Sequence, residues 1–122
     1  MQPLQQIQRL VDGKVMTAAS AASYPISIFI AGDLVVARQA LREYVRDNPL
    51  CVTLEATDYI YTGGLESGVR VGIINYPRFP CTRKELRLKA AKLAEYLRLR
   101  LCQESYTIQT PDNSVWVSSR PQ

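Results

Sequence analysis

The chain has 122 residues, of which 47% are hydrophobic and 21% charged, the balance of an ordinary globular protein. We therefore expect a single domain spanning residues 1–122, large enough to bury a core without disulfides or metal ions. No apolar run reaches the roughly 18 residues of a membrane span, and the first residues lack the apolar centre of a signal peptide. A protein of the cytosol, without a membrane partner, is expected.

The net charge is +4, from 15 Lys and Arg against 11 Asp and Glu, and the pI is near 9.1. This balance favours an anionic partner. It is too mild to predict duplex DNA binding, which usually needs a dense basic stripe. Most of the cations are arginine, whose planar fork grips a phosphate in two places.

The sequence contains no histidine, the commonest general base and metal ligand. The three cysteines are far apart and form no C-x-x-C motif, so we expect free thiols at Cys51, Cys81 and Cys102. We predict no metal and no cofactor. Three carboxylates have no spacing that sets them on one face with a nucleophile: Glu55, Asp58 and Glu66. The sequence therefore favours a binding protein without catalytic residues over an enzyme.

The N-terminal segment fits two structures. Asp12 and Gly13 favour a hairpin turn that joins residues 4–11 to a returning strand over 14–18. A short helix over residues 4–10 is the alternative, because Leu4, Ile7 and Leu10 recur at helical spacing. We favour the hairpin.

From residue 26 onward, strand and helix patterns alternate. Asp33 is a good helix N-cap, and Thr82 with Glu85 forms a Thr-x-x-Glu capping box. The three-glycine stretch over 62–68 reads as a turn. The predicted strands are 26–31, 51–56 (with 59–61 as a continuation or as another strand after a kink), 69–76, 105–110 and 114–118, and the predicted helices are 34–47 and one that begins after Thr82. This order predicts an α+β fold, an antiparallel sheet covered by two main helices.

The corner before the second helix, I-N-Y-P-R-F-P at 74–80, is the first candidate site. Its two prolines stiffen the loop, so the loop would lose little conformational entropy when a ligand binds. Arg78 can grip a phosphate, and Tyr76 or Phe79 can stack on a base, with Asn75 beside them. The competing interpretation makes these aromatic residues part of the core and the prolines simple turn residues.

Trp116 and Arg120 are the second candidate pair, near the C-terminus. Trp116 is either a core residue or a stacking platform, and it points outward if Val115 and Val117 point inward. A weaker set of candidates for a site between subunits is Arg9, Arg38 and Arg42.

Four stretches together resemble the phage-encoded Thoeris anti-defence proteins of the first described class: P-I-S-I-F-I-A-G-D at 25–33, Y-I-Y-T-G-G-L-E-S-G at 59–68, I-N-Y-P-R-F-P at 74–80 and P-D-N-S-V-W-V at 111–117. The resemblance covers nearly the whole chain. It implies a non-enzymatic sponge that sequesters cyclic ADP-ribose isomers made by TIR proteins, and in some members cyclic oligonucleotides of the CBASS pathway.

The resemblance further implies a homo-oligomer, a dimer or a hexamer, in the cytoplasm of an infected bacterial host, with a cyclic nucleotide ligand and no nucleic acid partner. The alternative from the residues is a small nucleic-acid-binding module or a protein-blocking module of the anti-CRISPR type. Such a module would show steep salt dependence and little preference for cyclic nucleotides.

Overall fold

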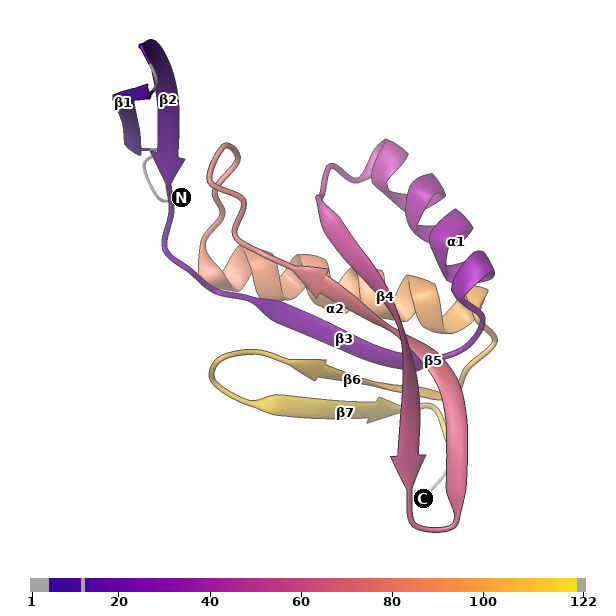
Figure 1. The fold of residues 1–122 in the computed structure, drawn as a ribbon. Coiled ribbons are helices and arrows are strands. Elements are labelled where there is room, and N and C mark those ends of the chain that lie inside the picture. The colour runs from indigo at the N-terminus through magenta and orange to yellow at the C-terminus, as the bar shows by residue number, and fades with distance from the viewer. Residues whose placement is uncertain (1–4, 12, 121–122) are drawn as a thin grey trace.

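The structure is a computed structural model that describes the backbone of residues 5–11 and both backbone and side chains of residues 13–120. Figure 1 shows how its elements are arranged. In chain order they are β1 (Gln5–Val11), β2 (Lys14–Ser20), β3 (Ile26–Ala31), α1 (Leu34–Asp47), β4 (Val52–Tyr61), β5 (Gly64–Ile73), α2 (Arg83–Arg100), β6 (Ser105–Gln109) and β7 (Ser114–Ser118). The predicted α+β class is confirmed.

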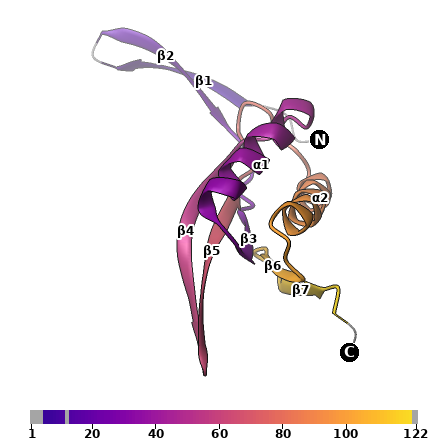
Figure 2. The same ribbon diagram turned by 90° about the vertical axis from the view of Figure 1, so that its right-hand side faces the viewer.

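The main sheet has five antiparallel strands in the order β4-β5-β3-β6-β7, so β4 and β7 form its edges. Both helices lie on the same side of this sheet (Figure 2). The β1–β2 hairpin forms a separate two-stranded sheet that projects away from the rest (Figure 1). The hairpin prediction for the N-terminal segment is confirmed, and the alternative short helix is not formed.

Alternation along the strands separates the two faces of the sheet. The helix-covered face carries the core, in which side chains from β3, β5 and the helices are buried together: Ile26, Ile28, Ile30, Val69, Val71, Ile73, Ala37, Leu41, Leu93 and Leu97. Within the described residues no helix covers the other face. Directly paired positions there form a row across all five strands: Glu55, Arg70, Phe29, Thr107 and Trp116.

The predicted helix starts are confirmed in atomic detail. Asp33 accepts a hydrogen bond from the Val36 backbone N–H at 3.0 Å, and Thr82 accepts one from the Glu85 N–H at 3.1 Å. These caps satisfy backbone donors that the first turn of a helix leaves without partners. They fix the residue at which each helix begins.

The prediction that residues 62–68 are a turn is wrong for most of that stretch. Only Thr62 and Gly63 turn the chain, with Gly63 at φ +83°, and β5 already begins at Gly64. Gly68 lies inside the strand because a Cβ there would come within 2.4 Å of the Tyr59 ring and 2.5 Å of the Ile30 carbonyl oxygen. The glycines therefore make room for aromatic side chains of β4, and the hairpin is longer than predicted.

Candidate functional site

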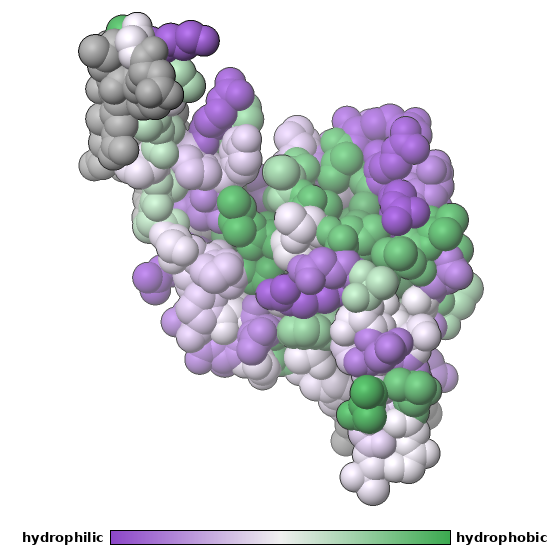
Figure 3. Space-filling model, viewed as in Figure 1, coloured by the Kyte–Doolittle hydropathy of each residue, from purple (hydrophilic) through white to green (hydrophobic). Residues whose placement is uncertain are grey.

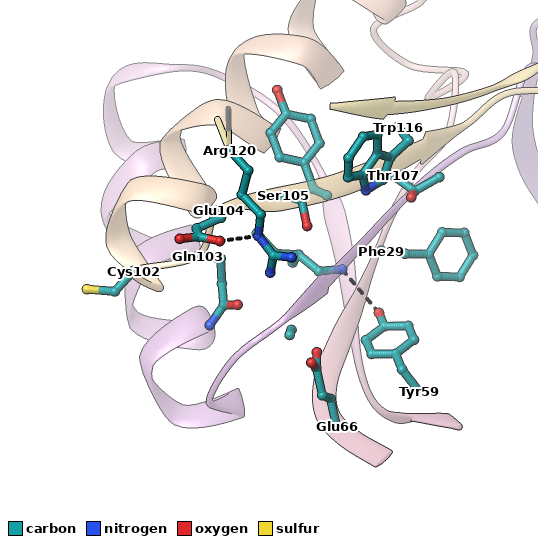
Figure 4. Close-up of a pocket in the computed structure, with 13 residues that line it drawn as sticks. Phe29, Tyr59, Glu66, Cys102, Gln103, Glu104, Ser105, Thr107, Trp116 and Arg120 are labelled. Atoms are coloured by element: carbon teal, nitrogen blue, oxygen red, sulfur yellow. Dashed lines mark hydrogen bonds and ion pairs between the residues drawn. The ribbon is translucent and has the colours of Figure 1, made fainter. Parts of the chain in front are cut away.

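A cavity of about 390 Å³ opens where β3 leads into α1 and α2 leads into β6. We call it the sheet-end pocket. Figure 4 shows its walls, and the residues that matter for its chemistry are Phe29, Tyr59, Glu66, Glu104, Trp116 and Arg120. They come from β3, β4, β5, β7 and the segments that flank β6 and β7, so the fold gathers residues from most of the sheet.

Tyr59 forms one wall and is held in place by its hydroxyl. The hydroxyl donates a hydrogen bond to the Val69 carbonyl and accepts one from the Ile30 N–H at 3.1 Å. Burial raises the pKa of Tyr59, so the phenol stays neutral at physiological pH. Because its ring lies over Gly68, the rigid β4–β5 pair sets its position.

Glu66 lies on β5 directly opposite Tyr59. The Tyr61 hydroxyl donates a hydrogen bond to Glu66 Oε1 at 3.0 Å, and this bond raises the pKa of Tyr61. The Glu66 side chain points into the middle of the pocket in Figure 4. A carboxylate with one oxygen already held by a phenol is well positioned to accept hydrogen bonds from a ligand.

The opposite wall carries an ion pair between Arg120 and Glu104. The backbone around it is fixed, because Ser119 N–H donates to the Glu104 carbonyl at 2.8 Å and Arg120 N–H donates to Ser118 Oγ at 3.1 Å. The Arg120 guanidinium points toward the same space as Glu66 (Figure 4). The pocket therefore presents a cation on one side and a carboxylate on the other.

Aromatic residues on the uncovered sheet face complete the pocket. Trp116 is 57% exposed, while Val117 packs against the core. The Phe29 ring has the Arg70 guanidinium 5.9 Å from its centroid. Arg70 is itself held by Glu55 at 3.0 Å and by Ser27 Oγ at 3.2 Å. Arg70, held by Glu55 and Ser27, thus packs against the Phe29 ring, and Trp116 offers a flat surface to a ligand.

The structure places the predicted ligand residues on different parts of the molecule. Trp116 and Arg120 line the sheet-end pocket. Tyr76 and Phe79 line a second, apolar cavity with Cys51, Cys81 and others. Their rings stack with centroids 6.0 Å apart, and Arg78 lies 5.6 Å from the Phe79 centroid. The corner and the C-terminal pair do not form one site.

Asn75 is buried and has a structural role. Its Nδ2 donates to the Ala22 carbonyl at 2.9 Å, and its Oδ1 accepts from the Cys81 N–H at 2.8 Å. It ties the proline corner to the segment before β3. Arg38 and Arg42 line a third cavity, between α1 and β4. Arg9 lies in β1, and its side chain is outside the described part of the chain.

Sequence reasoning missed Phe29, Tyr59 and Glu104 and set Glu66 aside. Glu66 falls in the stretch that is predicted from the sequence to be a turn, and its place in the pocket depends on the register that sets it opposite Tyr59. One signal was available: Tyr59 and Gly68 are the aromatic–glycine pair expected where a ring packs across a strand.

Among the described residues no group of three or more Cys, Asp or Glu could hold a metal ion. No described helix is long and apolar enough to cross a membrane.

No family model and no curated protein matches this sequence. Two solved structures match its fold. A phage SAM lyase in the apo state superposes with a TM-score of 0.66, at 18% identity, over 81% of this chain and 91% of that chain. A phage SAM lyase in complex with S-methyl-5'-thioadenosine superposes with a TM-score of 0.56, at 14% identity, over 82% of this chain and 92% of that chain.

These matches correct the expectation that the chain is not an enzyme, because both similar structures are named lyases. They also give no support to the Thoeris class of sponges. What they share with that expectation is coarser: the fold is one that a phage protein uses, and one of the two structures holds a small nucleoside ligand. At 18% and 14% identity the likeness establishes the fold alone.

Proposed function

We propose that this chain is an S-adenosylmethionine lyase that binds its substrate in the sheet-end pocket and releases S-methyl-5'-thioadenosine. The observation that carries the proposal is the match between this pocket and the charges of S-adenosylmethionine, in a fold shared with a protein that holds S-methyl-5'-thioadenosine. The substrate has a carboxylate, an ammonium group, a sulfonium centre and a flat adenine. The pocket offers a matching group for the carboxylate, for the ammonium group and for the adenine.

Arg120 is the partner for the substrate carboxylate, since guanidinium and carboxylate pair through two parallel hydrogen bonds. Glu66 accepts hydrogen bonds from the ammonium group or from the ribose hydroxyls. Trp116 stacks on the adenine, an interaction worth about 1–3 kcal/mol. Glu104 holds Arg120 in the free protein and orients it toward the pocket.

The bond that breaks follows from the two compounds. The sulfonium sulfur carries a methyl group, the adenosyl group and an aminocarboxypropyl chain, and S-methyl-5'-thioadenosine keeps the first two. The bond between sulfur and the chain is therefore cleaved, and its electron pair moves to sulfur, which becomes a neutral thioether. A lyase adds no water. The carbon that leaves the sulfur then bonds to the carboxylate of the same aminocarboxypropyl group and closes a lactone ring. Alternatively, the neighbouring carbon of that group loses a proton and an alkene forms.

The two routes ask different things of the protein. Ring closure by the carboxylate needs no base, only a chain held in a folded conformation, which positioning at Arg120 and Glu66 would supply. Alkene formation needs a base near the chain, and Glu66 is the candidate, since the sequence has no histidine. The second product, a lactone or an alkene, reports which route is used.

The expected role against bacterial defence remains part of the proposal, with a different mechanism. The protein would lower the concentration of S-adenosylmethionine by cleaving it, where the sequence had predicted sequestration of a cyclic nucleotide. The expected homo-oligomer also belongs to the proposal. The described chain leaves the sheet face around Trp116 without a covering helix. A second copy over this face would enclose the pocket and exclude water.

The test is incubation of the purified protein with S-adenosylmethionine, followed by mass spectrometry of the products. We expect S-methyl-5'-thioadenosine to form in proportion to the substrate consumed. Glu66→Gln should lower turnover, and Trp116→Ala should raise KM about 5- to 150-fold, which corresponds to the stacking energy. Phe79→Ala is the matched aromatic control outside the pocket. Unchanged substrate after long incubation with folded protein would refute the proposal.

A further inference from the structure

The net charge of the chain is concentrated on the first ten residues of α2. Residues 83–92 contain five Lys or Arg and one acidic residue, so they carry a net charge of +4, which is that of the whole chain. The rest of the sequence carries ten charges of each sign. A balance that is mild over the whole chain is therefore dense along about 15 Å of one helix. We call the five cations, all of them exposed, the basic surface of α2: Arg83, Lys84, Arg87, Lys89 and Lys92.

The basic surface of α2 has little acidic compensation. None of its five cations belongs to an ion pair within the described residues. Glu85 lies on the same helix, and Asp47 of α1 lines a cavity with Lys89 and Lys92. Arg83 and Arg87 are four residues apart, and like charges at this spacing on a helix repel. The folded chain therefore presents an excess of positive charge here, which an anionic partner would stabilise.

The apolar side of α2 is not available to a partner. Its residues are buried in the core: Leu86, Ala90, Leu93, Ala94 and Leu97. An amphipathic helix inserts into a membrane through its apolar face, so α2 cannot dock on a bilayer in that way. Among residues 83–92, Leu88 is the only large apolar side chain that is exposed. Stable protein–protein interfaces have an apolar core, whereas surfaces that bind nucleic acid are polar and strongly positive.

An exposed aromatic ring lies at the end of α2 that carries this surface. Phe79, in the loop that leads into α2, is 70% exposed. It lines a cavity together with Lys89, and Lys89 Nζ donates a hydrogen bond to Cys81 Sγ in the same loop at 3.4 Å. Figure 3 shows hydrophilic and hydrophobic surface side by side at this loop. A cation of the basic surface and an exposed aromatic ring are therefore neighbours.

The Phe79 ring is held in a defined orientation. The Tyr76 ring lies nearly parallel to it, at an interplanar angle of 14° and a centroid separation of 6.0 Å. The Phe79 N–H also donates a hydrogen bond to the Tyr76 carbonyl at 2.9 Å. Asn75 ties the loop to Ala22 and Cys81. A nucleic acid base on the exposed ring would therefore extend an existing stack, at little cost in conformational entropy.

We propose that the basic surface of α2 and the Phe79 ring together bind single-stranded nucleic acid. The cations contact successive phosphates, and one base stacks on Phe79. The combination selects this partner. A duplex keeps its bases paired inside and cannot use the ring, and an acidic protein segment has no planar base to place on it. This partner departs from the expectation that the resemblance implied.

The nucleic acid surface is separate from the sheet-end pocket. Neither Phe79 nor any of the five cations lines that pocket. The proposal therefore goes beyond the lyase activity and does not depend on it, and a binding assay tests it without any turnover of S-adenosylmethionine.

The test is fluorescence anisotropy of the full-length protein with a fluorescein-labelled oligothymidylate of about 20 nucleotides, at several salt concentrations. The comparison probes are a duplex and an abasic strand of equal length, polyglutamate, and vesicles of phosphatidylglycerol. The charge variant is Lys84→Gln/Arg87→Gln. Its control is Arg38→Gln/Arg42→Gln, which removes the same number of exposed cations from α1. Phe79→Leu removes the aromatic face and keeps an apolar side chain at the corner. Circular dichroism checks the folding of each variant.

We expect saturable binding of the oligothymidylate that weakens as salt rises. Each phosphate contact with a single strand contributes about 0.7 to the slope of log K against log salt, so the α2 variant should make that slope shallower by about 1.4. The α1 control should leave the slope unchanged. Phe79→Leu should weaken binding of the oligothymidylate about fivefold or more and leave binding of the abasic strand unchanged.

Three results would overturn the proposal. Equal losses in the α2 variant and the α1 control would show that binding follows total charge and not this surface. A duplex that binds as tightly as the single strand would leave Phe79 without a role. Polyglutamate or vesicles that bind more tightly than the oligothymidylate would identify an acidic protein or a membrane as the partner.

Discussion

Replacement of Gly68 by alanine tests the arrangement of the sheet-end pocket. Gly68 lies under the Tyr59 ring, and an added Cβ would come within 2.4 Å of that ring, 2.5 Å of the Ile30 carbonyl oxygen and 2.9 Å of the Ala31 Cα. Two of these three atoms belong to the backbone of the neighbouring strand. The clash can therefore be relieved only by displacing Tyr59 and separating β3 from β5.

The cost follows from the contacts that would be lost. Overpacking of this kind costs about 1–3 kcal/mol. Displacing Tyr59 would also break its hydrogen bonds to Ile30 and Val69, each worth about 0.5–1.5 kcal/mol. Alanine also has less conformational freedom than glycine in the unfolded chain, which stabilises the folded state by about 0.4–1 kcal/mol. We expect Gly68→Ala to lower the free energy of unfolding by about 2–4 kcal/mol.

Gly72→Ala is the matched control on the same strand and the same sheet face. An added Cβ there would come within 2.3 Å of Thr53 Oγ1 but no closer than 3.7 Å to Thr53 Cβ. Rotation of the threonine side chain relieves the contact, so the cost should stay within about 1.5 kcal/mol. Urea unfolding followed by tryptophan fluorescence measures both variants. A Gly68→Ala variant that is no less stable than Gly72→Ala would refute the assignment of Tyr59 to its place over Gly68.

Three further predictions concern the corner and the ion pairs. Asn75→Ala should cost about 2–4 kcal/mol in urea unfolding, because the Ala22 carbonyl and the Cys81 N–H would each lose a partner; a loss below 1 kcal/mol would contradict this. Arg78→Ala should leave S-adenosylmethionine turnover unchanged in kcat and KM, since Arg78 lies at the corner and not in the sheet-end pocket; a large rise in KM would return the corner to the active site. A hydrogen bond from Arg100 lowers the pKa of Glu43, and one from Arg98 lowers the pKa of Glu95. The stability that these carboxylates contribute is therefore complete above their ordinary pKa of 4.5 and is lost as the pH falls below that value. Thermal unfolding between pH 7 and pH 3 should therefore show a shallower decline for Glu43→Gln than for the unaltered chain, and identical profiles would count against the Glu43–Arg100 pair.

The sequence was sufficient for elements whose signals are local. The Thr82 cap, the Asp33 cap and the β-branched run of β3 each lie within a few residues, and they placed α1, α2 and β3 correctly. The β4–β5 hairpin was too short in the prediction, because Gly64 and Gly68 look like turn residues locally. Only their neighbours across the sheet, Tyr61 and Tyr59, explain them.

The candidate site depends on long-range pairing, which is why it was only partly predicted. Trp116 and Arg120 were selected from their chemistry, and both line the sheet-end pocket. Tyr59 and Glu66 join them through the register of β4 with β5, which no local pattern specifies. The proline corner was selected on the same chemical grounds, yet its aromatic residues line a different cavity. Residue type alone could not separate these two cases.

The most direct test of the proposed activity is an NMR measurement on S-adenosylmethionine labelled with ¹³C at its methyl group. The methyl signal reports the bonding of sulfur, and it moves when a sulfonium becomes a thioether. We predict that the purified chain converts the sulfonium signal to that of S-methyl-5'-thioadenosine, that Glu66→Gln slows the conversion, and that Phe79→Ala does not. A sulfonium signal that persists in the presence of folded protein would contradict the assignment of a lyase activity to this chain.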